Sequence, residues 1–535
     1  MGDRPVGPAA GAAGLPAKPP FNTAPKAAGT RWRLQADVAA LTQGLVASNF
    51  THLPVAEALF LQLPAAAGGA WLAALRQQVT ISDSAGSRDD AHAAAIAFTA
   101  SGLAAMGLPA AVIDTFSTPF REGMHQIDRR RRLQDDPALG TVVAGGARWS
   151  ANIPDRPLQA DELPAPAPTP VTVHVLLLLY ATDDGALARR LAAVQALLQA
   201  RQITIGHRRQ LSLGADRQGV LREHFGFADG MSQPVPTGPA IVPATGPQAD
   251  AQRQWHGVSA GEILLGHANL HDELAPGPLV AAGTPGTVGL STAGAPDGFC
   301  NLGLNGSYLV VRELRQDVAA FWQSLDKAAQ QIGQPAIDAR WLAERSVGRT
   351  LDGDLLQPGG PAAPQDGQPA NNLGFAHSDG HGLGCPLGAH LRRANPRDSL
   401  PSRDGDLSLT PDLLKSANGH RILRRGRKYG PDIADPLQDD GQDRGLLFMA
   451  LNSDLVRHFE FIQQTWLLNP SFATLFNETD PLLGPPGRMT IPAQPLRLRP
   501  AVQTYVQMSG GEYFFLPSLP ALDWLGQLPV PLPPA

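Results

Sequence analysis

The alternation of hydrophobic and polar positions predicts short strands mixed with amphipathic helices. Strands are predicted at residues 57–64, 93–99, 171–180, 306–312 and 445–452. Helices are predicted at residues 68–78, 183–198, 316–331 and 455–468, where leucines and valines recur at helical spacing. Because the strands and helices do not alternate regularly, the pattern favours an α+β protein with antiparallel sheets.

Glycine (56 residues) and proline (50 residues) concentrate in an N-terminal tail and in loop-rich stretches at 234–251, 275–298 and 351–369. The tail contains almost no large apolar side chain, so burial cannot offset the entropy lost on ordering it. We place a boundary in the first loop-rich stretch. The predicted organisation is a disordered tail at 1–30, an N-terminal half at 31–245 and a C-terminal half at 246–535.

The charge and cysteine content of the 535-residue chain argue against several classes of protein. A formal net charge of −5 leaves no basic footprint for nucleic acid. Two cysteines, Cys300 and Cys385, are too few for a disulfide framework in a chain of this size. No apolar run approaches the roughly 18 residues of a membrane span, and the N-terminal segment lacks a signal peptide's apolar core and a twin arginine. We therefore expect a cytoplasmic protein without a membrane partner, and a homo-oligomer stays open.

Two motifs favour ordinary structural roles. Residues 257–261 read GVSAG and match the G-x-S-x-G motif of hydrolases. That motif follows a buried strand, whereas residues 252–256 are polar, so a hydrolase is disfavoured. The four arginines at 129–132 are typical of a solvated helix face.

A segment at 371–397 is richer in chemistry and reads NNLGFAHSDGHGLGCPLGAHLRRANPR. It places His377, Asp379, His381, Cys385 and His390 within 14 residues. Imidazole, carboxylate and thiolate groups are ligands for zinc and other divalent ions. A glycine-rich loop around one buried histidine is the other interpretation of the same residues.

Four separated blocks of the sequence resemble the dye-decolorizing (DyP-type) haem peroxidases. The first is GFADG at 226–230, followed by MSQP, and the second is EILLG at 262–266, with NGSY at 305–308 and Arg312 downstream. The third is CPLGAHLRRANPRD at 385–398, and the fourth is ILRRG at 422–426, with YGP at 429–431 and RGLLF at 444–448. The blocks stand in the order of the family, and the chain length and long insertions resemble its large bacterial or fungal branch.

The resemblance implies two ferredoxin-like halves with antiparallel sheets and peripheral helices, related to dimeric α/β barrels, and one haem b per chain. Haem iron needs one protein ligand and an open opposite face. His390 matches the family's iron ligand, and its other ring nitrogen is expected to bond a carboxylate or a carbonyl. Asp454 is the candidate partner, with Asn452 or a backbone oxygen as alternatives.

On the open face, the resemblance assigns one acid–base group and one fixed cation. Asp229 matches the distal aspartate, which transfers a proton. Arg424 matches the distal arginine, which stabilises developing negative charge, and the adjacent Arg425 competes for that assignment.

The resemblance also implies a crowded distal pocket. Leu446 and Phe448 match positions that narrow access for peroxide. The compact branch of the family has an asparagine two residues after the distal arginine, where this chain has Gly426, so distal hydrogen bonding depends on two side chains. Bulky dyes do not reach a buried haem, which makes surface tryptophan or tyrosine radicals candidate relays. The candidates are Tyr429, Trp466 and Tyr505.

The resemblance therefore implies a peroxidase that reduces hydrogen peroxide and oxidises small organic donors, such as dyes and phenolics, by one-electron steps. Two alternatives stay open: a non-enzymatic haem-binding or haem-handling protein, and a divalent-metal protein that uses the cluster at 377–390. The presence of both Asp229 and Arg424 argues against a passive haem binder.

Overall fold

The computed structural model describes residues 32–86, 90–151, 170–216, 219–363, 370–400, 410–493 and 496–531. The tail predicted at 1–30 lies outside the described residues. The long strands fall into two sets of four along the chain. The first set is β2 (Val55–Gln62), β3 (His92–Phe98), β6 (Val175–Ala181) and β7 (Thr204–Ser212). The second is β13 (Ser307–Gln316), β17 (Arg427–Tyr429), β18 (Gly445–Asn452) and β21 (Val506–Leu516).

Both sets of strands pair in the same antiparallel order. The first set runs β7-β2-β6-β3 and the second β21-β13-β18-β17, which is 4-1-3-2 when each set is numbered along the chain. In the first set, α3 (Ala70–Gln78) connects β2 to β3 and α8 (Asp184–Ala200) connects β6 to β7, which gives the β-α-β-β-α-β arrangement of a ferredoxin-like unit. The predicted fold class is confirmed.

The two sets of strands join into one closed sheet. Phe515 on β21 pairs with Phe98 on β3, and Lys428 on β17 pairs with Ser212 on β7. Because β13 pairs with both β21 and β18, the sheet closes on itself as a barrel. The short strand β16 (Leu423–Arg424) adds to β18 beside β17. Closure leaves no free edge along these strands.

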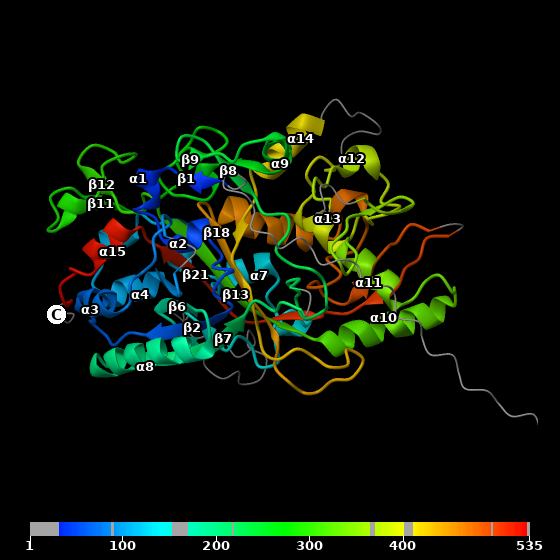
Figure 1. Cartoon of the computed structure of the whole chain (residues 1–535), viewed down its shortest axis with the longest axis horizontal. Coiled ribbons are helices and arrows are strands. Elements are labelled where there is room, and N and C mark those ends of the chain that lie inside the picture. The colour runs from blue at the N-terminus through cyan, green and yellow to red at the C-terminus, as the bar shows by residue number, and fades with distance from the viewer. Residues whose placement is uncertain are drawn as a thin grey trace, which may run out of the picture.

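Helices cover the outside of the barrel (Figure 1). In that view α8 lies below β2, β6 and β7, while α10 (Val318–Ile332) and α11 (Ala339–Val347) lie at the opposite end of the molecule from α3. The side chain of Asp317 caps α10 by accepting the Ala320 N–H (3.0 Å), and Gly333 ends it at φ +66°. The other helices are α1 (Ala36–Ala39), α2 (Gly44–Ala47), α4 (Ala100–Ala105), α5 (Ala110–Ile113), α6 (Thr118–Glu122), α7 (Ile127–Leu133), α9 (Pro247–His256), α12 (Phe375–Ser378), α13 (His390–Ala394), α14 (Thr410–Asn418) and α15 (Leu519–Leu525).

Short strands form small two-stranded sheets around the barrel. They are β1 (Arg33–Leu34), β4 (Trp149–Ser150), β5 (Val171–Thr172), β8 (Val235–Thr237), β9 (Ile241–Val242), β10 (Gly257–Ser259), β11 (Leu279–Ala281), β12 (Phe299–Asn301), β14 (Leu356–Gln357), β15 (Gly360–Pro361), β19 (Gly487–Arg488) and β20 (Ala501–Val502). None of the helices among the described residues is long and apolar enough to cross a membrane.

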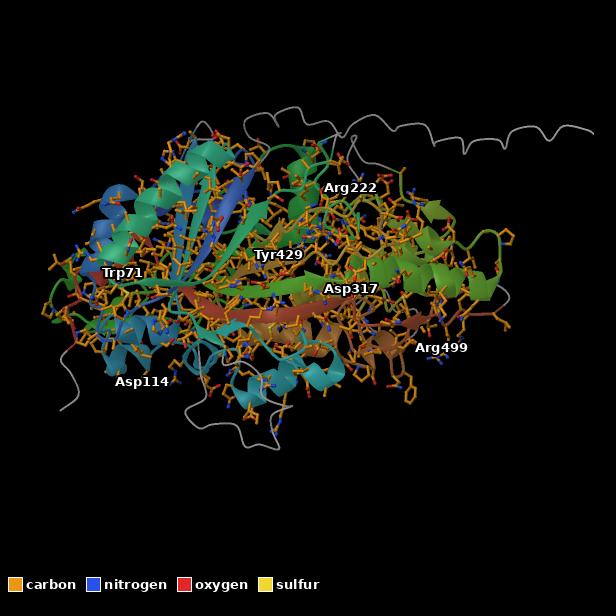
Figure 2. All side chains as sticks on the ribbon, turned by 90° about the horizontal axis from the view of Figure 1, so that it is seen from below. Trp71, Asp114, Arg222, Asp317, Tyr429 and Arg499 are labelled. Carbon is orange, nitrogen blue, oxygen red and sulfur yellow. The ribbon has the colours of Figure 1, made fainter. Side chains whose placement is uncertain are left out.

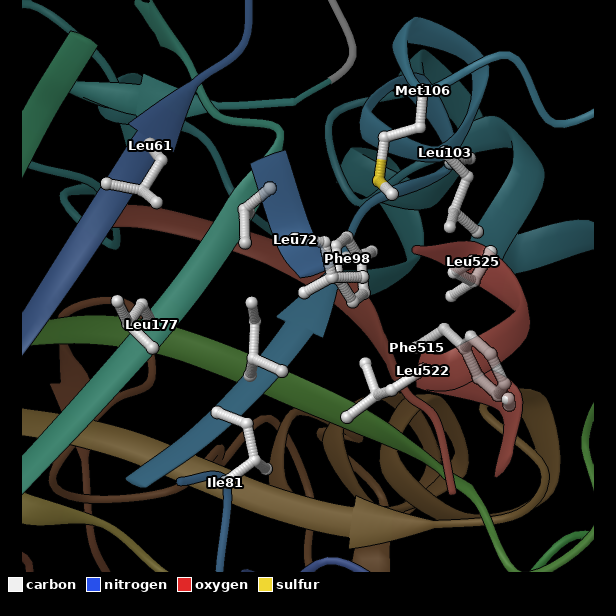
Figure 3. Close-up of a cluster of buried hydrophobic side chains, with 14 of the residues drawn as sticks. Leu61, Leu72, Ile81, Phe98, Leu103, Met106, Leu177, Phe515, Leu522 and Leu525 are labelled. Carbon is white, nitrogen blue, oxygen red and sulfur yellow. The ribbon is translucent and has the colours of Figure 1, made fainter. Parts of the chain in front are cut away.

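Alternate residues of each barrel strand enter different hydrophobic cores. On β2, Ala58 and Phe60 point into the barrel with Leu309, whereas Leu59 and Leu61 belong to the core beneath the outer helices. Figure 3 shows this outer core, where strand residues such as Leu61 and Phe515 meet Leu72 of α3 and Leu522 and Leu525 of α15. A period of two along the strand thus stabilises both layers.

The predicted elements are confirmed, with differences at their ends and in the loops. The predicted strand at 171–180 is interrupted between β5 and β6, and the predicted helix at 455–468 forms two π-helical segments, Val456–Glu460 and Ile462–Leu467. The predicted loop at 234–251 contains β8, β9 and the start of α9. The GVSAG sequence follows helix α9 instead of a buried strand, which agrees with its exclusion as a hydrolase motif.

The prediction of a fully solvated arginine face at 129–132 is wrong for one residue. Arg129 on α7 is 5% exposed and donates to both carboxylate oxygens of Glu460 at 2.8 Å. Glu460 lies 331 positions later in the chain, so the local pattern carries no sign of the pair.

The barrel interior holds a buried charged network centred on Glu313 of β13. Its carboxylate accepts hydrogen bonds from Arg209 Nη2 (2.6 Å), Ser509 Oγ (2.8 Å) and Trp149 Nε1 (3.1 Å), and lies 2.6 Å from His207 Nε2. Burial alone would raise the pKa of Glu313, but the hydrogen bonds and charges of His207 and Arg209 hold that pKa well below its usual range. Arg209 also lies 4.6 Å from the ring centroid of Tyr429, in the middle of the molecule (Figure 2).

We predict that Glu313→Gln lowers the free energy of unfolding at pH 7 by about 1.5–3 kcal/mol, because His207 and Arg209 lose a buried charged acceptor and Arg209 keeps only the half-exposed Asp443, 2.9 Å away. The stabilisation from the depressed pKa of Glu313 is fully present above the unfolded-state value of 4.5 and is lost progressively as the pH falls from there toward the much lower folded-state pKa. The difference between wild type and variant should therefore shrink on acidification. Denaturant unfolding at pH 7 and at pH 3.5 (about one unit below the reference) measures it.

Glu57→Gln is the matched control for the Glu313 variant. Glu57 is also a buried carboxylate of a barrel strand, but its ion-pair partner Arg208 is half exposed. Its loss should cost at most about 1 kcal/mol. Equal stability of wild type and the Glu313 variant at pH 7 would contradict the prediction.

Candidate functional site

A cavity of about 330 Å³ lies against the outer face of the C-terminal set of strands. The strand wall is formed by Arg312 and Leu314 of β13, Leu446 and Phe448 of β18, and Met508 of β21. Helix α13 and the π-helical segment Ile462–Leu467 contribute the facing residues, among them His390 and Trp466. The volume lies in the range of a buried cofactor or ligand site.

His390, the first residue of α13, lines this cavity and is held by a buried carboxylate. Its Nδ1 lies 2.8 Å from Oδ2 of Asp480, which is fully buried, and Oδ1 of Asp480 accepts the backbone N–H groups of Leu482 (3.0 Å) and Leu483 (3.2 Å). Burial alone would lower the pKa of His390, but the charge and hydrogen bond of Asp480 raise it. The imidazole keeps 32% of its surface exposed, and Nε2 bonds no described residue. This ring nitrogen is therefore available to a ligand in the cavity.

The predicted partner of His390 was wrong. Asp454 instead accepts the backbone N–H of Arg457 at 3.0 Å and so caps the turn that starts there. Asn452 is fully buried and its side chain bonds no described group. Asp480 lies 90 positions from His390 in an irregular loop, so no local spacing identifies it.

Asp229 and Arg424 line the same cavity, and Arg424 contacts the loop that carries Asp229. Arg424, on β16, donates from Nη2 to the carbonyl of Met231, and its backbone N–H donates to Gln233 Oε1 at 3.1 Å. Met231 lies two residues after Asp229, whose side chain is exposed and accepts the Gly230 N–H at 2.6 Å. A guanidinium and a carboxylate thus share one wall region of the cavity that His390 faces.

Arg425 points away from the cavity. Its guanidinium is buried and donates to the carbonyls of Leu45 (2.7 Å) and Val46 (2.5 Å) on α2, and burial lowers its pKa to about 10. The structure therefore distinguishes the two arginines and leaves Arg424 at the site.

Leu446 and Phe448, the positions predicted to narrow the pocket, both line the cavity. Leu447 and Met449, between and after them on β18, enter the barrel core. A Cβ atom at Gly426 would lie 2.8 Å from the carbonyl oxygen of Leu447. The close approach of these strands thus explains why no longer side chain stands at position 426.

Three buried arginines give this side of the cavity an excess of positive charge. Arg349 and Arg421 line the cavity, and Arg397 lies within electrostatic reach of both. Burial, then the charges of Arg424 and Arg349, lower the pKa of Arg397 to about 9. Its Nε and Nη2 atoms are buried and have no partner among the described residues. A buried cation of this kind favours an anionic group of a ligand.

The divalent-metal cluster that the sequence left open as an alternative does not assemble among the described residues. Asp379 instead orders its own loop by accepting the backbone N–H groups of Leu383 (2.7 Å), Gly384 (3.1 Å) and Cys385 (2.7 Å). Within the described part of the chain, no group of three or more histidine, cysteine, aspartate or glutamate side chains is arranged to hold a metal ion.

The three aromatic residues named as candidate surface relays are not on the surface. Tyr429, Trp466 and Tyr505 are 2%, 4% and 1% exposed, and Trp466 lines the cavity.

Comparison with curated proteins identifies dye-decolorizing peroxidases as relatives. The chain is 32% identical over 364 residues to a multifunctional dye peroxidase of an Amycolatopsis strain, covering 65% of this chain and 70% of the relative. It is 29% identical over 460 residues to a dye-decolorizing peroxidase of Mycetinis scorodonius, covering 80% and 75% of the two chains. No protein-family model matches the chain.

Solved structures agree in fold. A DyP-type peroxidase from Anabaena superposes with a TM-score of 0.67 at 24% identity, covering 92% of this chain and 95% of that one. The Amycolatopsis enzyme superposes with a TM-score of 0.65 at 23% identity, covering 92% and 96%. The sequence relatives, the closed pair of ferredoxin-like units and the cavity residues agree, and the chain belongs to the dye-decolorizing peroxidase family.

Proposed function

We propose that this peroxidase uses haem b to reduce hydrogen peroxide and to oxidise organic donors such as dyes and phenolics by one-electron steps. The observation that carries the proposal is the meeting of His390, Asp229 and Arg424 on one cavity, although they lie far apart in the chain. A passive haem binder needs the histidine alone. The nearby carboxylate and guanidinium favour a catalyst, as do the names of the relatives.

The residues present fit haem. His390 offers a free Nε2 to the iron, and the excess of buried guanidinium groups around Arg397 matches the two carboxylates that haem b carries. When bound, haem supplies an iron that cleaves the peroxide O–O bond and accepts electrons singly. Asp480 fixes the orientation of the His390 ring and increases its basicity.

Asp229 and Arg424 act on the proton and on the negative charge that develop in the peroxide step. Asp229 moves a proton from one peroxide oxygen to the other, and Arg424 stabilises negative charge on the departing oxygen without having to reorganise. Leu446 and Phe448 restrict the space beside these groups, which admits peroxide and excludes a bulky dye.

We expect His390→Ala to lose haem or to change its absorption spectrum, because it removes the imidazole that Asp480 orients. His420 also lines the cavity, but its Nδ1 lies 2.6 Å from the Arg457 carbonyl and its ring stacks on Phe461. Asp480→Asn should retain haem with about 10–100-fold weaker binding, since it removes the partner that orients the ring. Haem titration followed by absorption measures both. A His390→Ala protein with an unchanged spectrum would refute the ligand assignment.

Arg424→Leu should slow the peroxide-induced change in the haem spectrum by about 10²–10³-fold, because it removes the charge that stabilises the departing oxygen. Arg425→Leu is the matched control. It should lower thermal stability through the lost bonds to Leu45 and Val46 and leave the peroxide step unchanged. Stopped-flow mixing with peroxide distinguishes the two, and the reverse pattern would reassign the role to Arg425.

Arg397→Met should weaken haem binding roughly tenfold, because it removes a buried positive charge beside the cavity that attracts the haem carboxylates. The same change removes an uncompensated buried charge, so the haem-free protein should become more stable to heat. Arg499→Met, at a half-exposed arginine, is the control and should change neither property. Unaltered haem affinity in Arg397→Met would place the carboxylates elsewhere.

A further inference from the structure

The loop that carries Asp229 is tied down by a second carboxylate, Glu223, which also lines the cavity. Oε1 of Glu223 accepts the backbone N–H of Phe227 at 2.8 Å. Oε2 accepts the backbone N–H of Phe225 at 2.9 Å and the side-chain Nε2 of Gln316 at 2.7 Å. One side chain thus holds two backbone positions of its own loop and the last residue of β13.

The turn at residues 223–227 places two backbone N–H groups within hydrogen-bond distance of the Glu223 carboxylate. The Glu223 N–H donates to the Phe227 carbonyl at 3.1 Å, and the Gly226 N–H donates to the Glu223 carbonyl at 3.0 Å. Gly226 has a φ of +99°, which favours glycine, so the turn is specified by sequence. The carboxylate binds two N–H groups that this turn leaves pointing inward.

Glu223 is held at a cost in free energy. Burial raises the pKa of its carboxyl, the three hydrogen bonds lower it, and the nearby charge of Asp229 raises it again. No arginine, lysine or histidine among the described residues forms an ion pair with it. A half-buried carboxylate without a counter-ion loses part of its hydration, and the three hydrogen bonds offset that loss.

The position of Asp229 depends on anchors on both sides. On its N-terminal side, the three hydrogen bonds that Glu223 accepts (the Glu223 clamp) reach as far as Phe227. The next residue, Ala228, donates its N–H to the Leu351 carbonyl at 2.9 Å. On its C-terminal side Arg424 binds the Met231 carbonyl. Because Gln316 is the last residue of β13, its hydrogen bond to Glu223 ties the loop to the barrel.

We infer that Glu223 is a positioning residue for the peroxide step. Its clamp holds the loop so that the Asp229 carboxyl stands in the cavity at a fixed separation from Arg424. Glu223 exchanges no proton with peroxide in this role. The inference rests on the proposed function, in which Asp229 moves the proton.

The decisive experiment is a double-mutant cycle with Glu223→Gln and Asp229→Asn, read by stopped-flow mixing of the haem-loaded proteins with hydrogen peroxide. The glutamine keeps the size of the side chain but turns an N–H₂ group toward backbone donors. We expect Glu223→Gln alone to slow the step by about 10–100-fold, the size of effect that a misplacement of about 1 Å produces. In the Asp229→Asn background it should have no further effect, because there is no carboxyl left to position.

Two further variants separate positioning from general damage. Gln316→Leu removes only one of the three bonds to Glu223, so it should give a smaller reduction of the same kind. Glu262→Gln alters a buried carboxylate that also accepts a loop N–H, that of Leu270 at 2.8 Å, and pairs with His458, but it lies outside the cavity lining. It should lower thermal stability and leave the peroxide step unchanged.

Each contrary result overturns the inference in a distinguishable way. A normal peroxide step in Glu223→Gln, additive effects of the two substitutions, or an equal slowing in Glu262→Gln would each reject positioning by Glu223 while the role of Asp229 stands. A normal step in Asp229→Asn would reject the proposed role of Asp229, and the inference with it.

Discussion

Closure of the sheet through β13 is the constraint on which the rest of the structure depends. This strand pairs with β18 on one side and β21 on the other, and the ring that results admits only one inward and one outward set of side chains. Inward, Glu313 organises the charged interior; outward, Arg312 and Leu314 form part of the cavity wall. At its end, Gln316 holds Glu223. One strand therefore connects the barrel, the cavity and the loop of Asp229.

The two sides of the cavity carry buried charges of opposite sign. Asp480 is an anion that raises the pKa of His390 and so supports it as a donor to a metal. Arg349, Arg397 and Arg421 are buried cations. Burial lowers the pKa of each guanidinium, and the charges of neighbouring arginines lower it further, so an anionic ligand is favoured on this side. A cofactor with a central metal and peripheral carboxylates would relieve both, which supports the proposed haem over a bare divalent ion.

Charges that face inward also explain which strands sequence patterns missed. β7 carries His207 and Arg209 where a half-buried strand ordinarily has apolar residues, because these groups meet Glu313 inside the barrel. β21 contains Gly510, where a Cβ would lie 2.2 Å from Trp149 Nε1. The packing of Trp149 therefore requires a glycine at this position, although glycine is a poor strand former. Both are fourth strands of their units. Without them and the three-residue β17, the four-strand order was not apparent from periodicity.

The sequence by itself determined several local elements and the motif residues: β2, β3, β6, β13, β18 and the helices α3, α8 and α10, together with His390, Asp229 and Arg424 as members of family motifs. These follow from periodicity and from short blocks in which neighbours along the chain carry the information. The partner of His390, the choice of Arg424 over Arg425, the burial of Arg129 and the dispersal of the 377–390 cluster were decided by the tertiary structure. The first three depend on a carbonyl or a carboxylate that lies far away in sequence and comes close only in the folded chain, so no spacing along the chain encodes them. The cluster disperses because Asp379 accepts backbone N–H groups of its own loop instead of facing the histidines.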